Sequence, residues 1–169
     1  MNKQNFEGWI TGFLEGEGSF DVNLSKKKAK SGVVYMGCYA KFMIGLRQDD
    51  YRALEFIQKK LKCGKIIKYI EFSNHFGKQP MCRYTITIVK DLKEKLMPII
   101  DRVGMYSKKR KDYKIWKKGV NYIYKVQKKY GWKSWIKGKR FFKKFTEKDY
   151  EYIGELAKQL REVRKYKDD

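Results

Sequence analysis

The chain carries, at residues 8–20, the stretch GWITGFLEGEGSF, in which glycine recurs every fourth residue. This spacing places Gly8, Gly12 and Gly16 on one face of a helix, and the apolar residues of 6–16 follow helical spacing as well. Each glycine costs about 1 kcal/mol of helix propensity relative to alanine. Such a face therefore indicates that another backbone approaches closely there, either from the same chain or from a second copy.

Glu17 follows at the carboxyl end of this predicted helix. Free carbonyl groups and the helix dipole already disfavour an anion at such an end, so a carboxylate there makes electrostatic sense when a cation binds beside it. If a second copy brought its own Glu17 across the glycine face, the two carboxylates would repel one another without a metal ion. Oxygen ligands with open positions suit Mg²⁺. A lone glutamate, in contrast, is more often a solvated side chain.

The composition points to a polyanionic partner. The 169 residues include 41 Lys and Arg against 19 Asp and Glu, which gives a formal net charge of +22. The length favours one domain over residues 1–169. No apolar run approaches the about 18–20 residues of a membrane span, and three cysteines without a CxxC pair argue against a disulfide framework or a zinc site. We expect an intracellular protein without a membrane partner, in a prokaryotic cytoplasm or nucleoid or in an organelle.

Outward from the motif, the hydrophobic pattern predicts an α+β fold. Helical spacing predicts further helices, and a capping box at Thr146 predicts the start of a terminal one. The helices predicted from helical spacing fall at residues 49–61, 91–103 and 107–124, and the terminal one follows Thr146. Alternation of apolar and polar residues predicts strands at residues 20–25, 38–44, 65–72 and 83–89. The order of the elements implies an antiparallel sheet, each hairpin having one apolar and one polar face.

The stretch ITGFLEGEGSF closely resembles the LAGLIDADG motif of the LAGLIDADG homing endonucleases. The resemblance extends to LKCGKI at 61–66 and to Pro98 followed by SKKRK at 107–111. It implies the αββαββα core of that family over residues 6–118, with four antiparallel strands forming a DNA-binding saddle. Residues 119–169 then form a basic, aromatic-rich C-terminal helical extension.

The resemblance implies a site-specific, metal-dependent endonuclease that cuts both strands of a long pseudo-palindromic DNA site. Glu17 takes the place of the family's metal-binding acid, and the carbonyl of Gly16 lies beside it. Mg²⁺ is the expected cofactor, with Mn²⁺ as a substitute and with Ca²⁺ binding without supporting cleavage. Glu15 takes the place of an acid that is mainly structural in the family.

Two further catalytic positions follow from the resemblance. Lys108, or else Lys109, takes the place of the basic residue that contacts the reacting phosphate. Leu46 stands where the family often has a glutamine that binds the water network. We expect Gln48, or else Arg47, to replace that glutamine.

One motif in a chain of this length implies, by the same resemblance, a homodimer. Its two motif helices pack through Gly8, Gly12, Phe13 and Gly16, and its strands lie in the major groove. The residues expected to contact DNA are Asp21, Asn23, Ser25, Lys26, Lys27, Lys28, Lys30, Tyr39, Lys41, Lys65, Tyr69, Arg83, Thr85, Thr87, Lys139 and Arg140.

Two alternatives stay open at this point. One is a non-cleaving maturase that binds intron RNA with the same strands, and the other is an unrelated basic nucleic-acid-binding protein. The acid at Glu17 favours the endonuclease, because a pure RNA binder does not need it. An unrelated basic module would need neither that acid nor the glycine-spaced helix.

Overall fold

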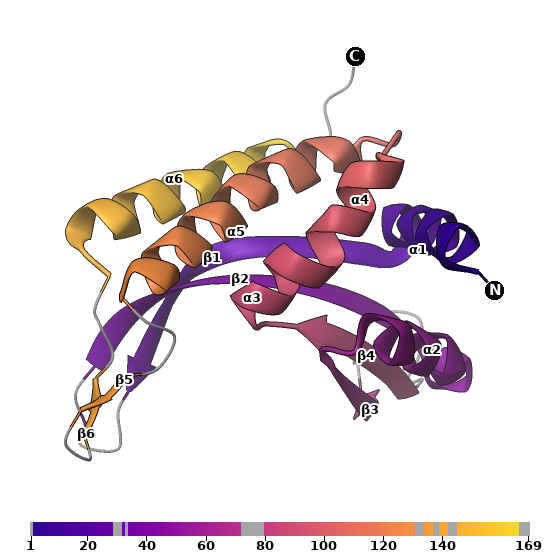
Figure 1. Cartoon of the computed structure of the whole chain (residues 1–169), viewed down its shortest axis with the longest axis horizontal. Coiled ribbons are helices and arrows are strands. Elements are labelled where there is room, and N and C mark those ends of the chain that lie inside the picture. The colour runs from indigo at the N-terminus through magenta and orange to yellow at the C-terminus, as the bar shows by residue number, and fades with distance from the viewer. Residues whose placement is uncertain are drawn as a thin grey trace. The chain divides into compact units, whose positions relative to one another are not determined.

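The computed structural model describes residues 2–28, 32, 34–71, 80–130, 134–136, 139–141 and 145–165. Its helices are α1 (Lys3–Glu17), the 3-10 helix η1 (Gln48–Asp50), α2 (Tyr51–Leu61), α3 (Val89–Asp91), the π-helix η2 (Leu92–Leu96), α4 (Met97–Val103), α5 (Lys109–Tyr130) and α6 (Glu147–Glu162). Its strands are β1 (Gly18–Lys28), β2 (Val34–Arg47), β3 (Lys65–Glu71), β4 (Pro80–Ile86), β5 (Ser134–Ile136) and β6 (Lys139–Phe141) (Figure 1).

The main sheet has four strands in the order β1-β2-β4-β3, and β5 and β6 form a separate two-stranded sheet. Strand β4 pairs antiparallel with β2 on one side and with β3 on the other. The predicted α+β fold with a four-stranded antiparallel sheet is therefore confirmed. The helices described here include none long and apolar enough to cross a membrane.

By their internal contacts the residues form two compact units. Unit 1 consists of Met1–Phe20 and Lys41–Arg110, and unit 2 consists of Asp21–Ala40 and Lys111–Asp169. The boundary expected between residues 118 and 119 falls inside α5, and the division at that point stays a prediction.

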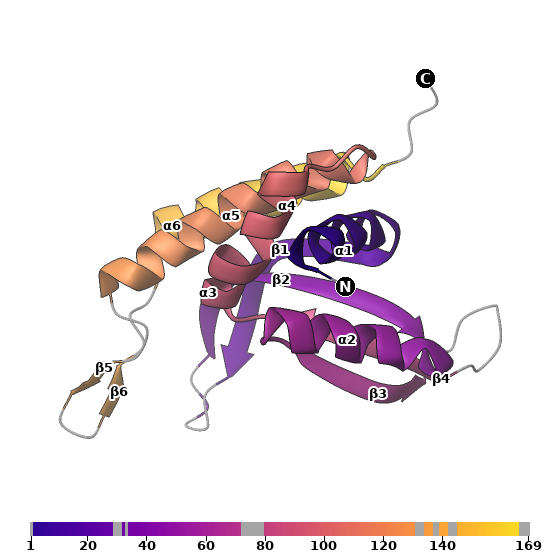
Figure 2. The ribbon, with the colours of Figure 1, turned by 45° about the vertical axis from the view of Figure 1, so that its right-hand side comes forward.

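Unit 1 is built around the apolar side of its strands. Phe42, Ile44, Tyr84 and Ile86 alternate along β2 and β4 and are completely buried. Helix α2 covers β3 and β4, as Figure 2 shows, with Leu54 and Ile57 among its buried residues. The strands form because this strict alternation gives each one an apolar face to bury.

Helix α1 packs into unit 1 through a buried stripe and through an ion pair with α4. Phe6, Ile10 and Leu14 are buried at the spacing of a single helix face. Arg102 of α4 donates two hydrogen bonds to Glu7, from Nε to Oε2 at 3.0 Å and from Nη2 to Oε1 at 2.7 Å. Such a bidentate pair fixes the position of α1 against α4.

In unit 2, helices α5 and α6 lie side by side (Figures 1 and 2). Trp116 and Ile123 of α5 and Leu156 and Leu160 of α6 are among the buried residues. The capping box predicted at Thr146 is present, because the Thr146 side chain accepts from the Asp149 amide and the Asp149 carboxylate accepts from the Thr146 amide.

Several element bounds differ from those predicted. Strand β4 is Pro80–Ile86 instead of 83–89, so Thr87 and Ile88 lie beyond it and Ile88 is 59% exposed. The helix predicted at 91–103 starts at Val89 and passes through a π-helical turn before Pro98. Proline lacks the amide that a regular helix needs, and the wider turn accommodates that loss. The pair β5–β6 had no alternating pattern long enough to predict it.

Candidate active site at the end of helix α1

The glycine face of α1 is bare. Gly8, Gly12 and Gly16 are exposed. Of the residues that the structure describes, none has a heavy atom within 4 Å of a Cβ built on any of the three glycines. The face is therefore not used for a helix crossing within the described part of the chain, which had been one of the two readings of the glycine spacing.

Aromatic side chains hold α1 next to α2. Trp9 stacks on Phe13 with ring centroids 5.3 Å apart, and it meets the edge of Phe56 of α2 at 5.5 Å. Phe13 is half-buried in this cluster. The aromatic contacts with α2 and the Arg102–Glu7 pair with α4 hold α1 in place without using its glycine face.

The carboxyl end of α1 carries both an exposed acid and a cation. Glu17 is the last residue of the helix and is exposed. The Lys109 ammonium donates to the carbonyl of Gly16 at 3.0 Å and to that of Leu14 at 3.4 Å. Carbonyl groups at a helix end attract cations, so this lysine occupies the place that the helix dipole favours.

Glu15 anchors the segment that bears Lys109. Its Oε1 accepts from the amides of Tyr106 and Ser107 at 2.7 and 2.6 Å. Burial raises the pKa of Glu15, but the hydrogen bonds from Ser107 and Tyr106 outweigh this, and its pKa lies below the ordinary value. A carboxylate that stays ionised and binds two amides fits the structural part expected for Glu15.

The lysine beside the motif carbonyls is thus Lys109, which the family resemblance offers as the alternative to Lys108. Lys108 is exposed next to it, and its part in catalysis stays a prediction. The contact joins residues 93 positions apart, and the only sequence signal for it is the basic run at 108–111.

Gly18 is a residue that the sequence reasoning missed. A Cβ at this position would lie 2.6 Å from the Leu14 carbonyl oxygen and 3.0 Å from the Phe42 ring. Because backbone cannot move aside cheaply, only glycine fits where α1 passes into β1. Its sequence signal is the glycine that directly follows Glu17.

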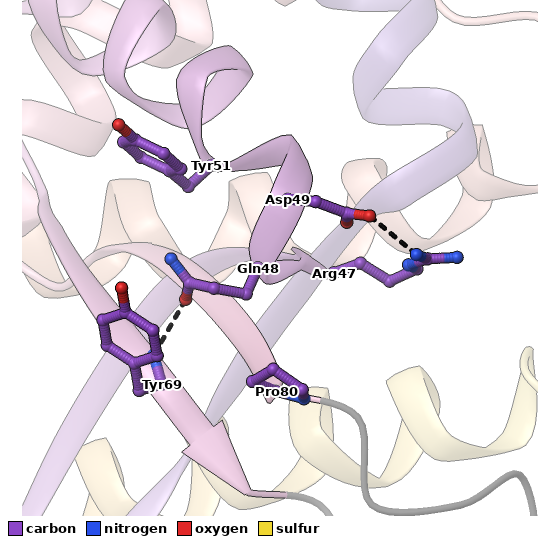
Figure 3. A pocket seen from close by; sticks show the side chains of 6 residues that line it. All are labelled: Arg47, Gln48, Asp49, Tyr51, Tyr69 and Pro80. Carbon is purple, nitrogen blue, oxygen red and sulfur yellow. Dashed lines mark hydrogen bonds and ion pairs between the residues drawn. The ribbon is translucent and has the colours of Figure 1, made fainter.

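Gln48 holds strand β3 (Figure 3). Its Oε1 accepts from the amide of Tyr69 at 2.9 Å, and Tyr69 has a left-handed φ of 58° at the irregular part of β3. Neighbouring Arg47 pairs with Asp49 at 2.6 Å. These residues, with Tyr51 and Pro80, line an open pocket of about 340 Å³. The amide oxygen of Gln48 thus binds the backbone of β3, and catalytic parts for Gln48 and Arg47 stay predictions.

The outer face of the sheet in unit 1 includes two neighbouring rows that cross three strands. Directly paired residues share a sheet face, and the neighbouring pairs Phe42–Ile86 and Ile44–Tyr84 are buried on the opposite face. The rows are Met43, Thr85 and Lys65, and then Gly45, Arg83 and Ile67. Of the predicted DNA contacts, Lys65, Arg83 and Thr85 are therefore brought together.

In unit 2, Asp21, Asn23 and Ser25 alternate with inward residues of β1, of which Val22 is fully buried. The Tyr39 hydroxyl of β2 donates to the Asp21 carboxylate at 3.3 Å. Burial and the Asp21 carboxylate raise the pKa of Tyr39.

The other predicted DNA contacts lie as follows. Lys26 is exposed on β1, Lys41 is half-buried on β2, Tyr69 is 73% exposed on β3, and Thr87 is exposed just past β4. The side chains of Lys27, Lys28, Lys139 and Arg140, and the whole of Lys30, lie outside the described residues.

At the end of α1 the described residues offer a divalent metal ion part of a ligand set. No group of three or more His, Cys, Asp or Glu side chains that could hold a metal ion occurs in the described residues. The motif supplies the Glu17 carboxylate and the Gly16 carbonyl, both at an exposed helix end. Mg²⁺ suits such a place, because it is commonly held by one or two carboxylates, water and substrate phosphates.

Comparison with known proteins connects this geometry with a family. Residues 10–120 match the model of the LAGLIDADG endonuclease family. Over 108 residues the chain is 30% identical to the probable intron-encoded endonuclease 3 of Neurospora crassa, a match that covers 64% of this chain and 18% of that protein.

Solved structures of this family share the fold. The I-SmaMI LAGLIDADG homing endonuclease bound to cleaved DNA matches 94% of this chain and 44% of its own, at 23% identity and a TM-score of 0.67. The LAGLIDADG meganuclease I-AabMI bound to uncleaved DNA matches 72% of this chain and 38% of its own, at 26% identity and a TM-score of 0.56. The chain thus spans less than half the length of these relatives, and by its sequence and its fold it belongs to the LAGLIDADG endonuclease family.

Proposed function

We propose that the chain is a site-specific, metal-dependent endonuclease that cuts both strands of a long, pseudo-palindromic DNA site as a homodimer. The observation that carries the proposal is the bare glycine face of α1 that ends in the exposed Glu17, in a chain of the LAGLIDADG endonuclease family. A second copy of α1 laid against this face through Gly8, Gly12 and Gly16 would bring two Glu17 carboxylates together. Like charges so placed favour a bound cation.

In this proposal Glu17 and the Gly16 carbonyl would hold Mg²⁺, with Mn²⁺ able to replace it and Ca²⁺ binding without cleavage. When bound, the metal polarises a phosphoryl oxygen and lowers the pKa of a water molecule. Lys109, and Lys108 beside it, place positive charge where charge develops on the phosphate during hydrolysis. Glu15 supports both lysines, because it fixes the preceding backbone at Tyr106 and Ser107.

The proposed substrate is double-stranded DNA held by the outer face of the sheet. A net charge of +22 favours a polyanion, because phosphate contacts release counterions. The side chain of Arg83 can make two hydrogen bonds to the major-groove edge of a guanine. The side chain of Asn23 can do the same at an adenine. Because its proposed substrate is genomic DNA, we also propose an intracellular location.

The test is cleavage of a randomised duplex library by the purified 169-residue chain with Mg²⁺. The wild type is compared with Glu17→Gln, and Glu151→Gln serves as the control, since Glu151 is an exposed glutamate on α6. We expect ends from one near-palindromic sequence, produced by the wild type and by the control and lost in Glu17→Gln or with chelator.

Two outcomes would contradict the proposal. Tight binding of one DNA sequence without cutting would favour a maturase, and the host intron RNA would be the next substrate. Cleavage retained in Glu17→Gln would remove Glu17 from the metal site.

A further inference from the structure

Ile67 is an exposed apolar residue on the outer face of the sheet in unit 1. It lies on β3 directly opposite Arg83, in the same row as Gly45, and its side chain is on the outer face. It is 54% exposed, whereas Ile66, which points to the other face, is half-buried. More than half of the surface of Ile67 is therefore open to solvent or to a binding partner.

The neighbours of Ile67 favour DNA as the occupant. Arg83 is its direct partner across the strands, and Lys65 is the next outer-face residue on its own strand. On the other side of Arg83 stands Gly45, where no heavy atom of the described residues lies within 4 Å of a Cβ position. An apolar side chain beside two cations matches a surface that is anionic and carries small apolar groups.

The major groove of DNA has that combination. The C5-methyl of thymine is the apolar group among the base edges exposed there, next to the N7 and O6 acceptors of guanine that suit arginine. Outer-face residues two apart on a strand are separated by about 6.8 Å, close to two base-pair steps. The two rows can therefore follow successive pairs of bases along one groove.

We propose that Ile67 reads the C5-methyl group of a thymine in each half of the DNA site, next to the base that Arg83 contacts. This inference rests on the proposed function, because it assigns a base preference to the same DNA-binding surface. It makes Ile67 a specificity residue and gives it no part in hydrolysis.

The experiment selects DNA with the wild-type chain from two randomised duplex libraries, one containing thymine and the other deoxyuridine in its place. The best thymine duplex is then rebuilt with one deoxyuridine at a time in each half-site, and binding is measured in Ca²⁺. Ile67→Ala is compared with Ile88→Ala, since Ile88 is 59% exposed against 54% for Ile67 but lies outside the strands.

We expect one thymine position in each half-site at which deoxyuridine weakens binding about fourfold, or about 15-fold when both half-sites are changed. Ile67→Ala should lose this discrimination at that position and keep the remaining base preferences. Ile88→Ala should behave like the wild type. Because Ile67 is exposed, its truncation is expected to leave the fold intact, which circular dichroism checks.

Three results would overturn the inference. If the wild type binds a defined sequence but thymine and deoxyuridine are equivalent at every position, no methyl group is read. If Ile67→Ala still discriminates at the same position, another residue reads the methyl. If neither library yields an enriched sequence, the proposed function fails and this inference fails with it.

Discussion

Helices α1 and α5 both carry glycine within their length, and the surroundings of Gly12 on α1 and of Gly119 on α5 are opposite. On α5, a Cβ at Gly119 would lie 2.6 Å from Val22 Cγ2 and 3.6 Å from Leu156 Cδ1. On α1, a Cβ at Gly12 would meet no heavy atom of the described residues within 4 Å. Both glycines cost helix propensity, about 1 kcal/mol relative to alanine, but among the described residues only Gly119 has close packing that offsets this cost.

This contrast separates glycines that pack against other parts of the chain from glycines whose surroundings the described residues leave open. Gly119 lets α5 approach β1 within unit 2, and a buried contact explains it. Among the described residues, no such contact explains Gly8, Gly12 and Gly16. The carboxylates divide in the same way, since Asp149 is buried and hydrogen-bonded whereas Glu17 is exposed at the end of the bare face.

The largest expected effect is that of Glu17→Gln. In the proposed endonuclease it should lower the cleavage rate by about 1,000-fold or more, because it removes charge from a metal ligand. The side chain is exposed, so the melting temperature should stay within about 1–2 °C of the wild type. Single-turnover cleavage and thermal unfolding measure the two effects; a large loss of stability would place Glu17 with the fold instead.

Next in size is the effect of Gly12→Leu on self-association. A bulky side chain on the bare face should weaken the proposed dimer by about 100-fold, a typical cost of overpacking at a close contact. Sedimentation velocity over a range of concentrations measures this. An unchanged dimer constant would show that copies do not associate through this face.

The opposite behaviour is expected at Gly119. Gly119→Ala should lower the free energy of unfolding by about 1–3 kcal/mol, because Val22 is stiff and fully buried and cannot move aside. Self-association should not change. Urea unfolding provides the measurement, and a neutral or stabilising effect would show that Gly119 is not held by close packing.

The carboxylates give a pH-dependent test. Burial raises the pKa of Asp149, but hydrogen bonds from Tyr122 and Thr146 outweigh it and hold the pKa below its ordinary value. A carboxyl whose folded pKa is depressed stabilises the fold above its unfolded pKa of 3.8 and loses that contribution as pH falls through the folded pKa.

We therefore expect Asp149→Asn to lower the free energy of unfolding by about 1–2 kcal/mol at pH 7. The deficit should shrink as the pH falls below about 4. Unfolding curves from pH 7 to pH 2.5 for both proteins provide the check. An equal deficit at all pH values would mean that the charge of Asp149 contributes nothing.

The smallest effect is expected for Gly12→Ala measured below the concentration at which the chain associates. Alanine meets no described atom there, so the fold should gain up to about 1 kcal/mol from helix propensity. Set beside Gly119→Ala, the same substitution should thus have opposite signs on the two helices. A loss of stability would mean that the face of α1 is packed within the chain.

Features that depend on neighbours in the sequence were predictable. The helix of α1, the alternating strands β1 and β2 and the capping box at Thr146 all follow from patterns within a few residues. Strand β4 was placed three residues late, because Ile88 continues the alternation although it precedes α3 and is exposed. Periodicity alone does not reveal where a strand loses its partner.

Contacts between distant residues were not predictable in the same way. Lys109 reaches the Gly16 carbonyl across 93 positions, and Gln48 reaches the Tyr69 amide across 21. A catalytic part for Gln48 was predicted from the family resemblance and stays a prediction. That its amide oxygen accepts a hydrogen bond from the irregular backbone of β3 could not be predicted from the sequence. The glycine face could be predicted because residues four apart lie on the same side of a helix. Glu17 could be assigned to the end of this helix because it directly follows Gly16.

The most direct test of a homodimeric endonuclease mixes equal amounts of wild type and Glu17→Gln before adding a supercoiled plasmid that contains the selected site. Random assembly of a homodimer puts one intact Glu17 into about half of the dimers. We predict that such mixed dimers cut one strand, so nicked circles should accumulate well above the level that either protein gives alone. Linear product at half the wild-type rate, without an increase in nicked circles, would contradict a homodimer in which each α1 supplies one Glu17 to one strand.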